Sequence, residues 1–160
     1  MAAVGVAALI IAVTPSAEAV VQQNLPAKQT VKRPIAEKKS HRLVLQVNVN
    51  DPATMNLALN NATNVAQYYR DRNEKAAIEI ITFGPGLHML RDDTSPVKAR
   101  IKTIKEANPD ISFQACGNTK ENMHRAENKE IPLIPEATLV KSGVVRVMEL
   151  QELGWAYVRP

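Results

Sequence analysis

The chain has very little cysteine: Cys116 is the only one among 160 residues. A single thiol cannot form an internal disulfide, so packing must stabilise the fold. The absence of a CxxC pair also excludes a self-contained thioredoxin-like dithiol cycle. Unpaired cysteines commonly behave as small buried hydrophobic residues. On composition alone, a structural and a reactive role for Cys116 both stay open.

Aromatic residues are also few, with two Phe, three Tyr and one Trp. Nucleic-acid bases stack on aromatic side chains, so stacking platforms are scarce. The formal net charge of +4 is concentrated before residue 43. Six of the 20 Lys and Arg and two of the 16 Asp and Glu precede that residue, which leaves 14 of each sign in residues 43–160. This part presents no net field for a phosphate backbone, and no nucleic-acid partner is expected.

Long apolar runs are confined to the first residues. Residues 4–13 form an apolar stretch too short to span a bilayer, followed by a proline and by Ala17-Glu18-Ala19, an A-x-A cleavage site. These parts predict a cleavable signal peptide over residues 1–19 and a periplasmic protein. No later run approaches the roughly 20 apolar residues of a membrane helix, so no membrane span is expected.

The predicted signal peptide departs from the usual pattern in one respect, because no Lys or Arg precedes the apolar stretch. This leaves open whether Met1 is the true start, and a buried N-terminal helix is the alternative interpretation. Residues 20–40 are polar, basic and proline-containing, with no apolar period that could bury a face. They predict a disordered basic linker ahead of an α/β domain over residues 41–160.

From residue 41 onward, short apolar runs alternate with amphipathic stretches, which is typical of βα units. Asp51 and Pro52 are suited to begin the first helix, as its cap and its first turn. The pattern predicts an α/β fold with about five strands in a mainly parallel sheet and helices on both faces, a flavodoxin-like layering. The expected strands are residues 42–49, 76–83, 111–115, 137–140 and 155–158, and the main helices 52–72, 97–107, 118–127 and 143–153.

Three loops follow consecutive predicted strands and should meet at the carboxyl edge of the sheet, where ligands bind in open α/β folds. The first holds Asn50, the second Gly84, Gly86 and His88, and the third the segment Cys116-Gly117-Asn118-Thr119. These residues form the predicted site, with Cys116 as its reactive member and the others as binding or supporting residues.

Cys116 is placed by the pattern at a strand end and ahead of a helix, with Asn118 or Thr119 as the expected helix cap. The free N–H groups of a helix N-terminus favour a nearby anion, so a thiol there has a lowered pKa. Gly117 lets the backbone approach the sulfur closely. The position therefore suits a nucleophile or a persulfide carrier.

Other chemistry has weaker support. The three histidines, His41, His88 and His124, have no metal-ligand spacing, and no metal or cofactor is expected. His88 could support a thiolate across the loop edge, although lining a loop is the commoner role. The glycines at 84 and 86 do not form a nucleotide-binding pattern, and no nucleophile elbow is present.

Three segments in this order resemble the DsrE/DsrF-like family, and specifically its exported single-domain members. They are residues 81–87 (ITFGPGL), 113–119 (FQACGNT) and 149–160 (ELQELGWAYVRP). The resemblance covers the chain from about residue 43 to its end. It implies a five-stranded α/β sandwich, homo-oligomers, and a cysteine that carries sulfane sulfur as a persulfide, at the position of Cys116.

Two functions are carried forward. The first is an exported sulfur-relay or thiol-redox accessory protein, at most transferase-like, with Cys116 as the persulfide or thiol carrier. The second is a non-catalytic small-ligand-binding or oligomeric module in which Cys116 is structural. A homo-oligomer is expected, whereas the sulfur donor and acceptor are not specified by the sequence.

Overall fold

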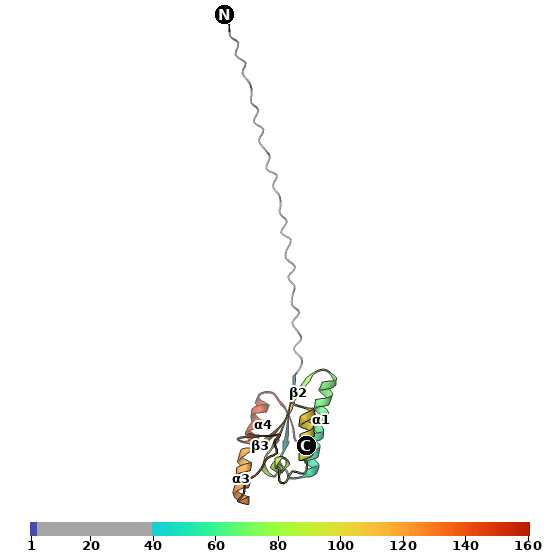
Figure 1. Cartoon of the computed structure of the whole chain (residues 1–160), viewed down its shortest axis with the longest axis vertical. Helices are drawn as coiled ribbons and strands as arrows, with labels where there is room; N and C mark the ends of the chain where they lie inside the picture. Colours follow the sequence, from blue (N-terminus) through green and yellow to red (C-terminus); the bar gives the residue numbers. More distant parts are fainter. Residues whose placement is uncertain (3–39) are drawn as a thin grey trace. The chain divides into compact units, whose positions relative to one another are not determined.

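The computed structural model describes residues 1–2 and 40–160 of the chain (Figure 1). The predicted signal peptide from residue 3 onward, and the predicted linker up to residue 39, lie outside the described residues. Among the residues described, no helix has both the length and the apolar character needed to cross a membrane.

The α/β fold predicted from the alternating pattern is confirmed. Along the described chain each strand is followed by a helical connection to the next strand, and the connection from β2 to β3 contains two helices, η1 and α2. The strands are β1 (Ser40–Val47), β2 (Lys75–Thr82), β3 (Ile111–Cys116), β4 (Ala137–Val140) and β5 (Ala156–Val158). The helices are α1 (Pro52–Asp71), the 3-10 helix η1 (Gly84–Leu90), α2 (Lys98–Ala107), α3 (Gly117–Glu127) and α4 (Gly143–Glu152).

All five strands are parallel, in the order β4-β3-β2-β1-β5. The larger core lies on one face of the sheet, where α1, α2 and η1 pack on the strands. Met123 of α3 packs against the same core. Helix α4 covers the opposite face, where Val147 and Leu150 pack on Val44 and Ile81. Figure 1 shows α1 and α4 on opposite sides of the sheet, so helices cover both faces as predicted.

Local signals explain where α1 begins. The Asp51 carboxylate accepts hydrogen bonds from the backbone N–H groups of Ala53, at 3.3 Å, and Thr54, at 2.8 Å. Pro52 occupies the first turn, where its missing N–H costs nothing. Asn56 and Asn60, one turn apart on α1, connect this helix to α2, because Arg100 donates to both side chains.

The start of α3 differs from the sequence-based expectation. Asn118 and Thr119 were the predicted caps, but β3 continues through Cys116 and α3 begins at Gly117, so Cys116 itself is the cap residue. Strand and helix thus meet without an intervening loop. This junction places the thiol closer to the first N–H groups of α3 than a separate cap residue would.

Candidate functional site

The chain reverses its winding at the carboxyl ends of β3 and β4. These strands are neighbours, yet α3 leaves β3 toward the larger core while α4 leaves β4 toward the opposite face. Such a switch point opens a crevice beyond the strand ends, which is where open α/β sheets bind ligands. Cys116 is the last residue of β3, and its register partner Val140 is the last residue of β4. The topology therefore places the only thiol at the switch point.

Side-chain alternation along β3 directs Cys116 toward α4. Phe113 and Ala115 belong to the larger core, so Gln114 and Cys116 point to the other face. The first residue of α4 packs directly on the thiol-bearing carbon: a methyl group added at Gly143 would lie 3.2 Å from Cys116 Cβ. Only 4% of the Cys116 surface is exposed. The thiol thus lies between the N-termini of α3 and α4.

The surroundings of the Cys116 thiol favour its ionised form. Burial raises the pKa of the thiol, but the Thr119 hydroxyl and the backbone N–H groups of Gly143, Thr119 and Asn118 lower it by more. The pKa consequently lies below that of an ordinary cysteine. Two helix N-termini contribute these donors, which extends the expectation from sequence, where only the helix after Cys116 was considered.

Thr119 connects the thiol to the loop after β2. Its Oγ1 accepts a hydrogen bond of 3.0 Å from the backbone N–H of Gly84. Because the hydroxyl accepts from Gly84, its own hydrogen is available to donate to the thiolate. Cys116, Asn118, Thr119 and Gly84 therefore form one connected group, as the sequence predicted.

The other predicted residues have different positions. Gly117 and Gly86 are close-packing positions, since an added methyl group would lie 3.1 Å from the Val140 carbonyl oxygen and 2.2 Å from that of Val47, respectively. His88 Nδ1 lies 2.8 Å from Thr94 Oγ1. His88 lines a second cavity of about 380 Å³ together with Gly84 and Thr119, but no hydrogen bond joins it to the thiol among the described residues. Asn50 is exposed in the loop after β1.

The loop between β4 and α4 is the part of the site that sequence reasoning missed. Lys141, Ser142 and Gly143 close the crevice from the side opposite α3, and the Lys141 carbonyl accepts a 3.1 Å hydrogen bond from Asn118 N–H. The signal was present as Ser142, directly ahead of a predicted helix that begins with Gly143 and shortly after a predicted strand. Recognising it required knowing that β4 pairs with β3.

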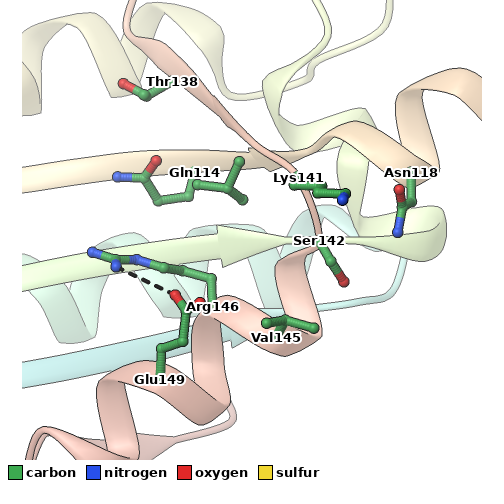
Figure 2. Close-up of a pocket in the computed structure, with 9 residues that line it drawn as sticks. Gln114, Asn118, Thr138, Lys141, Ser142, Val145, Arg146 and Glu149 are labelled. Atoms are coloured by element: carbon green, nitrogen blue, oxygen red, sulfur yellow. Dashed lines mark ion pairs between the residues drawn. The ribbon is translucent and has the colours of Figure 1, made fainter.

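A groove of about 750 Å³ extends from this loop along the uncovered part of the sheet, between α4 and β4. This volume is typical of small-molecule sites, which measure about 300–1,000 Å³. Figure 2 shows Asn118, Lys141 and Ser142 toward one end, and Gln114, Arg146 and Glu149 toward the other. Its lining residues are Gln114, Asn118, Thr138, Val140, Lys141, Ser142, Val145, Arg146 and Glu149.

Gln114 is an unusual lining residue because it is buried yet incompletely bonded. Only 8% of its surface is exposed, and its side-chain oxygen Oε1 has no hydrogen-bond partner within the described part of the chain. A buried polar atom without a partner costs free energy. Sequence reasoning did not single out Gln114, since a polar residue in a strand is normally taken as solvent-facing.

Arg146 anchors α4 to the sheet beside this groove. Its guanidinium donates to both carboxylate oxygens of Glu79 on β2, at 3.1 and 2.6 Å. The Glu79 side chain is mostly buried, so the pair is held away from water. The Glu79 carboxylate raises the pKa of Arg146, with a smaller contribution from Glu149. The bidentate ion pair between Arg146 and Glu79 therefore holds α4, which forms one wall of the groove, in place on the sheet.

Within residues 1–2 and 40–160, no group of three or more His, Cys, Asp or Glu side chains could hold a metal ion. The chain is similar to a solved structure, the protein of unknown function MTH1491 from Methanobacterium thermoautotrophicum, with 27% sequence identity and a TM-score of 0.63. The match covers 75% of this chain and 99% of the other. It supports the α/β fold. Neither the family models nor the curated proteins gave a match.

Proposed function

We propose that this protein is a sulfur-relay or thiol-redox accessory protein of the DsrE/DsrF-like type, with Cys116 as the carrier of sulfane sulfur. One observation carries the proposal: the thiol lies at the switch point of the sheet, where donors from two helix N-termini lower its pKa. A thiolate is the nucleophile in thiol–disulfide and persulfide chemistry.

The proposed reaction has two transfers. The Cys116 thiolate attacks the sulfane sulfur of a donor, a new S–S bond forms to Sγ, and the donor's S–S bond breaks. The donor leaves as a thiol or hydrosulfide with the electron pair of the broken bond, so neither oxidant nor reductant is needed. An acceptor thiolate then attacks the outer sulfur, and Cys116 leaves as the thiolate. A lowered pKa assists both the attack and the departure.

The alternative function, a non-catalytic binding module, is favoured by the small exposure of the thiol and by the adjoining groove. Alkylation with iodoacetamide separates the two. A carrier should react with a rate that follows a pKa below the ordinary cysteine value of about 8.5. A structural cysteine should stay inert at neutral pH and react only on unfolding.

The proposal includes export to the periplasm and self-association. Export rests on the predicted signal peptide, and the intact mass of the exported protein should show a mature chain that begins at Val20. Self-association is supported by exposed apolar side chains of α4, namely Val144, Met148 and the groove-lining Val145, and by Leu139 on the edge strand β4. Light scattering that shows a monomer at high concentration would contradict self-association.

A further inference from the structure

The groove beside Cys116 contains an acceptor that nothing in the described part of the chain satisfies. Gln114 is more than nine-tenths buried, and its Oε1 has no partner. Figure 2 shows its side chain in the groove, between Thr138 of β4 and Arg146 of α4. Arg146 is already engaged by the Glu79 carboxylate. The unmet requirement at this end of the groove is therefore a hydrogen-bond donor.

The charges of the lining restrict the ligand further. Toward the Gln114 end of the groove, two carboxylates, Glu149 and Glu79, pair with the single guanidinium of Arg146, which leaves one net negative charge there. Lys141, an ammonium, lies toward the opposite end with Asn118 (Figure 2). Val140 and Val145 add apolar surface to the lining. A ligand that matches this order carries an ammonium or amide N–H at one end, a carboxylate at the other and methylene groups between them. These are the features of amino acids and small peptides.

The position of the groove next to Cys116 adds a third requirement for the ligand, which is that it contains sulfur. Val140 pairs with Cys116 across the strands, Asn118 N–H faces the thiol, and Ser142 precedes the Gly143 N–H that also faces it. The Lys141 end of the groove thus borders the Cys116 site. We propose that the groove binds a low-molecular-weight thiol built from amino acids, and that its persulfide form is the sulfur donor to Cys116. This inference rests on the function proposed above.

The transfer balances without another reactant. The Cys116 thiolate attacks the outer sulfur of the bound persulfide, forming the Sγ–S bond as the donor's S–S bond breaks. The persulfide proton ends on the departing small thiol, which is released, and Cys116 is left as a persulfide anion. Lys141 would hold the donor's carboxylate, while Gln114 would accept from its ammonium or amide. Both are binding residues that do not touch the transferred sulfur.

S-methylglutathione, a thioether that cannot transfer sulfur, tests the binding step alone. We expect calorimetry or NMR titration to detect its binding to the full chain, and Gln114→Leu to weaken it about three- to tenfold, as for loss of one hydrogen bond. Lys141→Gln should weaken it about two- to fivefold. Gln151→Leu on α4 and Lys102→Gln on α2, both exposed and outside the groove, should bind as wild type does.

The unfolding temperature of Gln114→Leu distinguishes a ligand-binding role of this residue from a structural role. Since Oε1 has no partner to lose, this variant should unfold at the wild-type temperature or above it. Weaker binding together with undiminished stability identifies a ligand-binding role. A clearly lower unfolding temperature would mean that the amide supports the fold. The affinity of the Lys141→Gln variant, which should fold as stably as wild type, would then decide whether the groove binds the ligand.

Loading of Cys116 from inorganic polysulfide separates this inference from the proposed function, because polysulfide needs no groove. Loading by polysulfide with no S-methylglutathione binding at about 10 mM overturns the ligand class and leaves the carrier function standing. Binding without any loading overturns the carrier function and leaves the ligand class standing. Equal binding by wild type, Gln114→Leu and Lys141→Gln would also overturn the inference.

Discussion

Gly143→Ala tests the packing of α4 against the thiol. The added methyl group would lie 2.9 Å from Phe83 Cδ1, 3.1 Å from Phe83 Cβ and 3.2 Å from Cys116 Cβ. The Phe83 ring can rotate slightly, but each of the two Cβ atoms is bonded directly to a Cα and cannot move without the backbone at the ends of β2 and β3. The N-terminus of α4 must therefore move outward by a few tenths of an ångström.

Two energies of opposite sign decide the effect on stability. Overpacking of a well-packed site costs about 1–3 kcal/mol. Alanine in place of glycine gains up to about 1 kcal/mol within a helix, and less at its first position. The net destabilisation should be about 1–2 kcal/mol, measured by urea unfolding. The outward shift also takes the Gly143 N–H away from Cys116, so the pKa of the thiol should rise.

The pKa is read from the rate of iodoacetamide reaction against pH, compared with a control that truncates an exposed neighbour on the same helix turn, Val144→Ala. Gly143→Ala should shift the profile toward higher pH, whereas Val144→Ala should not. If Gly143→Ala changed neither the dependence of the alkylation rate on pH nor the stability, the close approach of α4 would not determine the pKa of the thiol.

Three further predictions concern the Cys116 thiol and a buried arginine that lies outside the candidate site. Thr119→Val should raise the pKa of Cys116 and slow its alkylation at neutral pH, while Thr119→Ser should keep the wild-type profile because the hydroxyl remains. Because the pKa of Cys116 is lower in the folded than in the unfolded protein, wild type should gain stability over Cys116→Ser as pH rises from below the folded pKa to above about 8.5. An unfolding free energy, measured with urea, that changes with pH equally in both proteins would contradict this. Arg91 is buried and paired with Asp93 and Glu127, which lowers the pKa of Glu127 to about 2, so this contribution to stability is present above about pH 4.5 and is lost as pH falls toward 2. Arg91→Leu should therefore reduce the loss of stability at acid pH, and a dependence of stability on pH identical to wild type would refute a stabilising role for these ion pairs.

Much of the fold could be predicted from the sequence because its signals are local. The runs at 76–83 and 111–115 match β2 and β3 to within one residue at each end, and Asp51 caps α1 as its side chain and position suggest. The strand at 137–140 was placed correctly, although it is short. Alternation of apolar runs and amphipathic stretches is sufficient for this level of description.

The candidate site was only partly predictable because it depends on which strands are neighbours. Cys116, Thr119 and Gly84 come together as expected, since their loops follow adjacent strands. Gly143 contacts the thiol only because β4 pairs with β3 and α4 then crosses to the other face. The small exposure of Cys116 and the buried amide of Gln114 have the same tertiary origin, which no sequence pattern contains.

The central claim is that Cys116 carries sulfane sulfur, and intact mass spectrometry of the mature protein after incubation with inorganic polysulfide tests it most directly. The account predicts that wild type gains the mass of one or more sulfur atoms, that a reducing thiol removes them, and that Cys116→Ser gains none. Wild-type protein that stays unmodified, or a Cys116→Ser variant that gains the same mass, would contradict the account.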